Sequence, residues 1–175
     1  MSRLRIRPIE YGDMPFVIFL EHKVFKSCLD ANLLRFILKK RSSVGSVACL
    51  DGVRVGFSIT RKLKNRKSHE RRMFLDSLAV LPEYRRTGVG TALLRECYRD
   101  LHTPITMIET YVEETNLAGL LFMRNCGWIA TEMIREKNED FANYIRVMFR
   151  TDWLKALNSD PPKSMLRDAY IMSVS

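Results

Sequence analysis

An apolar run that passes through a basic, glycine-containing loop into a helical pattern constrains this chain more than any other feature. Residues 78–94 read LAVLPEYRRTGVGTALL. The apolar run ends near Val80, Pro82 breaks it, and from Val89 apolar residues recur at helical spacing. The first N–H groups of a helix have no partner inside the helix, and the helix dipole makes that end positive. The segment therefore predicts a strand, an anion-binding turn and a helix in succession.

The glycines and arginines of this turn favour a pyrophosphate as the anion. Gly88 and Gly90 let the backbone close around phosphate groups, and Arg85 and Arg86 add positive charge. Other phosphate loops fit worse, because Leu93 stands where a dinucleotide-binding fingerprint needs glycine or alanine, and the Gly-Lys pair of a P-loop is missing. A plain strand–turn–helix connection without a ligand is the alternative interpretation.

The apolar periodicity of the remaining chain predicts a mixed α/β fold. Asp51-Gly52 between two apolar runs is a hairpin signal. Asp13 and Asp30 are candidate helix caps, Asn116 opens a short helix, and Gly127 closes it. The basic residues 61–72 are read as a loop or a polar extension of the hairpin. The predicted order is a strand (4–8), helices (13–25 and from 30), strands (44–50, 53–60 and 73–80), a helix (from 89), a strand (105–112), a helix (116–127) and strands (128–134 and 144–149).

The length of 175 residues suits one domain that buries its own core. We assign residues 1–150 to that domain and residues 151–175, which Pro161-Pro162 interrupt, to a C-terminal tail. The tail either packs on the domain or joins two copies in a homodimer, and the sequence leaves both open.

The cysteines and histidines do not indicate a metal site. Four cysteines form no C-x-x-C pair, and three histidines lie far apart. The expected thiols are reduced and buried, and neither a signal peptide nor a membrane-spanning run is recognised, so a cytoplasmic protein is expected. The net charge of +9 attracts anions, whether a phosphorylated cofactor, an acidic protein, a membrane or nucleic acid.

The turn and its flanks resemble the GCN5-related N-acetyltransferase (GNAT) superfamily. Residues 85–90, RRTGVG, are similar to its R/Q-x-x-G-x-G/A signature, and Asp51-Gly52 with Gly56 resembles the hairpin of its second and third strands. Residues 112–116, VEETN, with Ala118 and the later Gly127, resemble its V-x-x-x-N-x-x-A…G-F block. The resemblance covers residues 4–149 in order and implies one GNAT-like domain, with a six- to seven-stranded mixed sheet and about four helices.

The resemblance also implies how acetyl-coenzyme A is held. The backbone of residues 78–80 would pair with the pantetheine arm, the loop would hold the pyrophosphate, and Asn116 would lie near the cysteamine end. The fourth and fifth strands of the fold splay apart to admit the thioester. The implied coenzyme-contacting residues are Leu78, Ala79, Val80, Arg85, Arg86, Thr87, Gly88, Val89, Gly90, Thr91, Asn116 and Met123.

A direct transfer needs a neutral amine, a base and a polarised carbonyl, for which a backbone N–H near Val80 is available. Asp76, in the strand before the loop, is our first choice of base, acting through water; a salt-bridged, non-catalytic Asp76 is the alternative. Glu109 and Glu113 are second choices.

The general acid is the weakest point of the resemblance. Many relatives carry a tyrosine four residues before the glycine of G-F, and here that position is Met123, which cannot donate a proton. A thiol of pKa about 8.5 can leave without such help. Tyr111 and Tyr144 are the substitute candidates, with an ordinary half-buried aromatic as the alternative for each.

Residues 143–148, NYIRVM, resemble the last strand of N-terminal and ribosomal-protein alanine acetyltransferases, so a protein or peptide amine is favoured over a small molecule. The rival functions are a non-catalytic acyl-coenzyme A-binding module, suggested by Met123, and nucleic-acid binding through residues 61–72. The second is disfavoured because aromatic residues do not interleave these charges.

Overall fold

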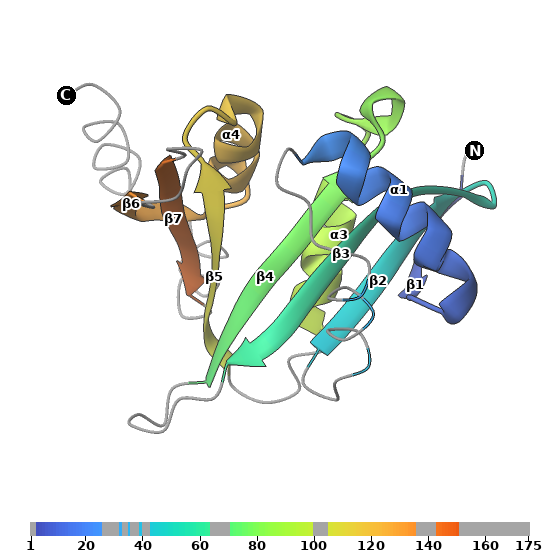
Figure 1. Ribbon diagram of the computed structural model, residues 1–175, viewed down its shortest axis with the longest axis horizontal. Coiled ribbons are helices and arrows are strands. Elements are labelled where there is room, and N and C mark those ends of the chain that lie inside the picture. Colours follow the sequence, from blue (N-terminus) through green and yellow to red (C-terminus); the bar gives the residue numbers. More distant parts are fainter. Residues whose placement is uncertain are drawn as a thin grey trace. The chain divides into compact units, whose positions relative to one another are not determined.

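The computed structural model describes residues 3–25, 32, 35, 39, 43–63, 71–99, 105–135 and 143–150 (Figure 1). The chain forms two compact units. The first unit contains Met1–Lys64 and Met73–Thr103, and the second contains Asn65–Arg72 and Pro104–Ser175.

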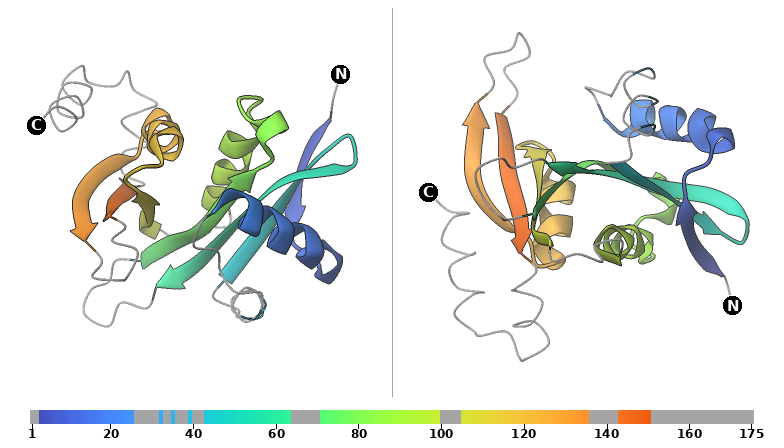
Figure 2. Two further views of the ribbon diagram at one scale, coloured as in Figure 1. Left: turned by 45° about the horizontal axis from the view of Figure 1, so that its top comes forward. Right: turned by 90° about the horizontal axis from the view of Figure 1, so that it is seen from below.

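Among the described elements, the first unit is a sheet with helix α1 (Met14–Val24) on one face and helix α3 (Val89–Arg99) on the other. Its strands lie in the order β1 (Leu4–Pro8), β2 (Ser43–Leu50), β3 (Val53–Leu63) and β4 (Arg71–Val80), of which Arg71 and Arg72 belong to the second unit. Helices α1 and α3 cover opposite faces of this sheet (Figure 2). The core against α1 includes Leu20, Phe57 and Ile59, and the core against α3 includes Ala48, Val55 and Leu93.

The β2–β3 hairpin confirms the turn that was predicted from Asp51-Gly52. Both residues have positive φ, 50° and 83°, which is the backbone that a tight hairpin turn needs. A register shift between Ala48 and Cys49, opposite Gly56 and Arg54, places a β-bulge in the pair.

Asp13 precedes α1 as predicted, but its side chain does not cap the helix. The carboxylate instead binds two arginines from neighbouring strands. It accepts hydrogen bonds from Arg7 Nη1 and Nη2 at 2.6 and 2.8 Å and from Arg54 Nε at 2.6 Å. The side chain of Asp13 is only 1% exposed, and the hydrogen bond from Arg7 outweighs burial to hold the pKa of this carboxyl well below its usual range. The helix start is therefore anchored to β1 and β3 by charge.

We expect Asp13→Asn to lower the free energy of unfolding by about 2–3 kcal/mol at pH 7, because it leaves two arginines without their anion. The stabilisation by a carboxyl of lowered pKa is complete above its unfolded pKa of about 3.9 and is lost as the pH falls below it. Urea unfolding at pH 7 and pH 3 measures both effects. Asp51→Asn, which keeps an acceptor for the Arg3 N–H, is the control. Equal losses in the two variants would contradict the assignment.

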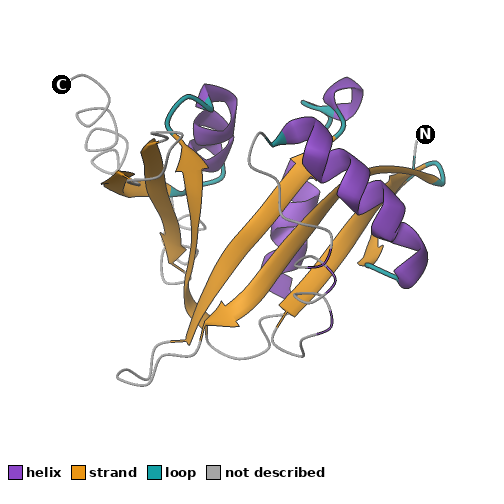
Figure 3. Cartoon of the chain, viewed as in Figure 1, coloured by secondary structure: helices purple, strands orange, loops and turns teal. Residues whose placement is uncertain are grey.

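The second unit contains β5 (Ile105–Glu113), α4 (Leu117–Asn125), β6 (Ile129–Arg135) and β7 (Asn143–Arg150), with the antiparallel strand order β5-β7-β6 (Figure 3). Asn116 caps α4, since its Oδ1 accepts a hydrogen bond from the Gly119 N–H at 2.9 Å. Gly127 has φ of 83° after the helix, as predicted for its end.

The predicted mixed α/β class and element order are confirmed for the residues described. Seven strands are present, and three α-helices lie in the described part where about four were predicted. Of the helix expected from Asp30, residues 32, 35 and 39 are described and are helical. The tail 151–175 and residues 64–70 of the basic stretch lie outside the described residues. The described ends of that stretch, Arg61–Leu63 and Arg71-Arg72, extend β3 and β4. Among the described helices, none is long and apolar enough to span a membrane.

Candidate functional site

The first part of the candidate site is the connection from β4 to α3, within the first unit. One turn of 3-10 helix, η2 (Pro82–Tyr84), follows β4. The Thr87 hydroxyl donates to the Tyr84 carbonyl oxygen at 2.6 Å, and Arg85 Nε donates to the Val80 carbonyl oxygen at 3.2 Å. These two hydrogen bonds hold the loop in its conformation. The side chains of Arg85 and Arg86 are exposed, so the surface of the loop is positively charged.

A row of six backbone N–H groups, in this loop and the first turn of α3, makes no hydrogen bond to any described residue. Those of Arg86 to Thr91 have no acceptor among the residues described, and the first amide of the helix to donate is that of Ala92, to the Gly88 carbonyl oxygen at 2.9 Å. Arg86 and Gly88 both have positive φ, 65° and 88°, which turns successive N–H groups toward one concave side. This row fits the pyrophosphate of a coenzyme, although the contacts of individual residues with it stay predictions.

Gly88→Ala tests that fit, because a side chain at φ of 88° strains the loop while the added Cβ meets nothing within 4 Å. We expect the free energy of unfolding to fall by about 1–2 kcal/mol and the affinity for coenzyme A to fall about tenfold. Gly52→Ala is the matched control, since it has φ of 83° and equally open space but lies in the β2–β3 turn. Titration calorimetry and urea unfolding of both variants separate strain from binding. A similar loss of affinity in both would contradict the assignment.

The end of β4 lies close against the bulged part of β3. A Cβ on Gly56 would lie 2.8 Å from the Ala79 carbonyl oxygen and 3.2 Å from side-chain atoms of Leu93 and Val80. Beyond Val80, the Leu81 N–H donates to the Val55 carbonyl oxygen at 2.9 Å. The predicted pairing of residues 78–80 with a pantetheine arm stays a prediction, but Gly56 is required where these backbones approach.

Asp76 is a buried carboxyl beside one arginine. Its Oδ1 lies 2.8 Å from Arg61 Nε, and the Asp76 side chain is 6% exposed against 46% for Arg61. Its Oδ2 is buried and has no hydrogen-bond partner among the described residues. Burial raises the pKa of Asp76 to about 6, although Arg61 acts to lower it. Asp76 therefore changes charge near neutral pH, as a general base must, and it also forms the ion pair of the alternative interpretation.

The two candidate tyrosines lie on one face of the second unit's sheet. Tyr111 of β5 is directly opposite Arg146 of β7, and Glu113 is opposite Tyr144. Because directly paired residues and alternate residues share a face, all four side chains emerge on the same side. Tyr111 is 47% exposed and Tyr144 is half-buried, so both reach the surface of this unit.

The other candidates in the second unit have structural contacts. The Asn116 side chain is the cap of α4, and a Cβ on Gly119 would lie 2.7 Å from its Nδ2. Met123 is buried, at 7% exposed, and its carbonyl oxygen accepts from the Trp128 N–H at 3.0 Å. Their contacts with coenzyme stay predictions.

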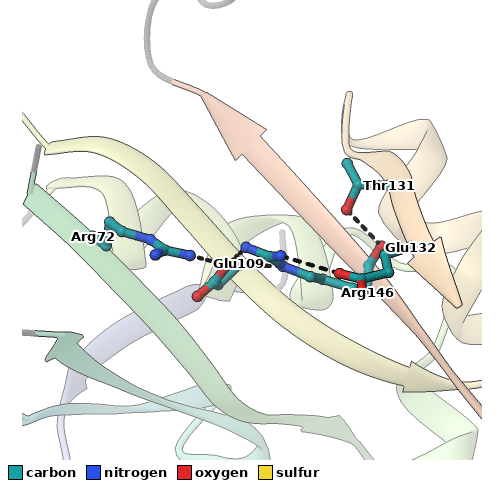
Figure 4. A network of polar contacts seen from close by, with 5 residues as sticks. All are labelled: Arg72, Glu109, Thr131, Glu132 and Arg146. Carbon is teal, nitrogen blue, oxygen red and sulfur yellow. Dashed lines mark hydrogen bonds and ion pairs between the residues drawn. The ribbon is translucent and has the colours of Figure 1, made fainter. Parts of the chain in front are cut away.

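Glu109, a second-choice base, is the centre of an ion-pair network within the second unit (Figure 4). Its Oε2 accepts from Arg72 Nη2 at 2.7 Å and from Arg146 Nε at 3.0 Å, and Arg146 Nη2 also donates to it. Glu132 lies 3.4 Å from Arg146 Nη1 and is 57% exposed. The Glu109 side chain is 6% exposed, so this carboxylate is a buried anchor for two arginines.

In the first unit, Asp76 and residues 78–80 lie on the same strand, β4, and the hydrogen bond from Arg85 to Val80 joins the loop to the end of that strand. In the second unit, Tyr111 and Tyr144 lie on one face of the sheet. The alternative interpretation from the sequence, an Asp76 that is salt-bridged beside the basic residues 61–72, anticipated this ion pair but did not identify Arg61 as the partner. The alternation of apolar and polar residues along β3 does not indicate which residue fifteen positions away pairs with Arg61. Among the described residues, no cluster of histidine, cysteine, aspartate and glutamate is suited to hold a metal ion.

Comparison with known proteins agrees with this geometry. Residues 10–128 match the sequence profile of the acetyltransferase (GNAT) family. No curated protein sequence matches the chain significantly.

Solved structures show the same fold. The ribosomal-protein-S18-alanine N-acetyltransferase from Escherichia coli is 18% identical, with a TM-score of 0.72 over 85% of this chain and 94% of that one. NAA60 from Arabidopsis thaliana, in complex with a bisubstrate analogue, is 14% identical, with a TM-score of 0.75 over 85% and 98%. Naa50 from the same plant, in complex with the bisubstrate analogue CoA-Ac-MVNAL, is 18% identical, with a TM-score of 0.70 over 83% and 97%.

Proposed function

Because the chain belongs to the acetyltransferase (GNAT) family, we propose that it transfers an acetyl group to a primary amine of a protein or peptide. We propose further that this amine is an N-terminal amine or a lysine, and that it attacks the acetyl group directly in a ternary complex. The enzyme is an N-acetyltransferase that uses acetyl-coenzyme A as co-substrate. The observation that carries the proposal is the row of N–H groups from Arg86 to Thr91, which have no acceptor in the described part of the chain and so support pyrophosphate binding.

Acetyl-coenzyme A supplies the acetyl group as a thioester, which an uncharged amine can attack. The amine nitrogen forms the new bond to the carbonyl carbon, the carbon–sulfur bond breaks, and the sulfur leaves as a thiolate. The proton of the amine passes to the Asp76 carboxylate, directly or through water. With a pKa of about 6, Asp76 is ionised at pH 7 and has a driving force for proton transfer that an ordinary aspartate lacks. Glu109 is the poorer base because two arginines occupy its Oε2.

The leaving thiolate needs a proton from a group other than Met123. Tyr111 is the exposed candidate and Tyr144 is the half-buried one, and both lie on the same face of their sheet. A thiol with pKa about 8.5 leaves more readily than an alcohol, so the acid is worth less here than in ester chemistry.

A protein or peptide acceptor is supported by the structural neighbours. They include N-acetyltransferases, one with the peptide-containing analogue CoA-Ac-MVNAL and one complex with a bound Gag peptide and CoA. An α-amine with pKa about 7.7–8.0 is several hundred times more often neutral at pH 7 than a lysine with pKa about 10.4, which favours N-termini.

Thiol release from acetyl-coenzyme A tests the proposal, with free N-terminal peptides, internal-lysine peptides and small amines as acceptors. We expect release to depend on a peptide amine and the product to gain one acetyl group by mass spectrometry. Turnover of the small amines but not of the peptides would show that the acceptor is a small molecule and not a protein or peptide. Coenzyme binding without release across the whole panel would favour a non-catalytic module, as Met123 suggests.

A further inference from the structure

Arg61 is an ordered cation at the surface beside the proposed base. Its Nε lies 2.8 Å from Asp76 Oδ1, and its Cζ lies 5.1 Å from the centroid of the Phe74 ring. The carboxylate and the aromatic face together fix the planar guanidinium from two sides. The Arg61 side chain is nevertheless 46% exposed, so it is immobilised without being covered.

The outer edge of this guanidinium is unused. Only Nε is engaged by Asp76, and Nη1 and Nη2 have no polar partner within the described part of the chain. These two nitrogens donate in parallel with a spacing that matches the two oxygens of a carboxylate. An arginine already held in place loses less rotamer entropy on binding such a group than a free surface arginine does.

We propose that Arg61 is an acceptor-binding residue that pairs with a carboxylate of the acetyl acceptor, so that the enzyme prefers acidic peptides. The inference rests on the proposed function, because it places the acceptor amine beside Asp76, the neighbour of Arg61. The carboxylate comes either from an acidic side chain close to the amine or from the C-terminus of a short peptide. The net charge of +9 favours the same class of acceptor and disfavours polyamines.

Competing acceptors measure the preference directly. Three short peptides with the same N-terminal residue serve as acceptors. The acidic peptide has aspartate at positions two and three and an amidated C-terminus, and the neutral amide has asparagine at both positions and an amidated C-terminus. The third peptide has asparagine at both positions and a free C-terminal carboxylate. We expect kcat/KM for the acidic peptide to exceed that for the neutral amide by about tenfold to a hundredfold. An advantage of the third peptide alone would identify the C-terminal carboxylate as the ligand.

Variants of Arg61 and its neighbour assign the preference to one side chain. Arg61→Gln should bring the ratio of the two kcat/KM values close to one, and Arg61→Lys should keep only part of it, because lysine lacks the parallel donors. Arg61→Glu should reverse it in favour of a lysine-containing peptide. Lys62→Gln removes the same charge one residue away and should leave the ratio unchanged. Any effect of Arg61 on Asp76 is common to all acceptors and cancels in the ratio.

Binding separates this inference from the proposed function. The N-acetylated acidic and neutral peptides are titrated into the protein with coenzyme A, by fluorescence anisotropy, in the wild type and in Arg61→Gln. If the acidic peptide binds in an Arg61-dependent way but is not acetylated, the proposed acetyl transfer is wrong and the Arg61 subsite is supported. A ratio that stays the same in every variant, or an Arg61→Gln defect confined to the KM for acetyl-coenzyme A, would overturn the subsite even if transfer is active.

Discussion

Asp76→Asn should lower kcat for acetyl transfer by about 10²–10⁴-fold, with little change in the affinity for coenzyme A. Asparagine keeps the shape of the side chain and a hydrogen-bond acceptor for Arg61, but it cannot take a proton. In the wild type, kcat/KM should rise with pH up to the acceptor pKa of about 8, because the amine must lose its proton, and the rise should be steeper below about pH 6, where Asp76 also ionises. The additional rise below pH 6 should be absent in the variant, which stopped-flow thiol detection over a range of pH can measure.

Glu83→Gln is the matched control for Asp76, since it removes an exposed carboxylate from the adjacent η2 turn. It should leave both kcat and the pH profile unchanged. If Asp76→Asn retains the wild-type rate and the same rise near pH 6, the base is another group, and the Arg61–Asp76 pair serves the structure only.

The second large effect is on stability: Glu109→Gln should lower the free energy of unfolding by about 3–5 kcal/mol. The substitution leaves the guanidinium groups of Arg72 and Arg146 without the buried anion that both of them contact. Urea unfolding gives the loss of free energy, and hydrogen exchange should show it at the amides of β5 and β7.

Glu132→Gln is the control for Glu109, because Glu132 contacts the same Arg146 but is 57% exposed and 3.4 Å away. It should change stability by less than about 1 kcal/mol. Replacing all three charges together, by Arg72→Met, Glu109→Leu and Arg146→Met, should recover much of the loss, because no charge is then left unpaired. An equal cost for Glu109→Gln and Glu132→Gln would show that the network contributes through Arg146 alone.

Features that depend on neighbouring residues were predictable from the sequence. The Asp51-Gly52 turn, the Asn116 cap and the Gly127 helix end are each set by the backbone preferences of one or two residues. The backbone shape of the loop between β4 and α3 was predictable for the same reason, since a glycine of positive φ and the free amides of a helix start are local properties. Their spacing along the chain was enough to predict the class and order of the elements.

Long-range polar pairs were not predictable in this way. Asp13 was assigned as a helix cap, which is the best local use of an aspartate before Pro15, yet Arg54 from a strand forty-one residues away is among its partners. Glu109 lies thirty-seven residues from both Arg72 and Arg146. No sequence pattern indicates that these arginines surround it, so from the sequence it remained a candidate base. Ion pairs between distant strands depend on the register of those strands, and the register can be assigned only when the strand order of the sheet is known.

The proposed binding of the coenzyme pyrophosphate by the amides of Arg86 to Thr91, which are unpaired within the described residues, would also link this protein's lifetime to the supply of its co-substrate. A ligand that binds the folded loop and not the unfolded chain adds about 2.7 kcal/mol of stability at a hundredfold excess over its dissociation constant. Since cellular proteases act mainly on unfolded chains, a fall in the coenzyme pool would shorten the half-life of the protein as well as slow its reaction. Starved cells would then hold less of the enzyme without any change in its synthesis.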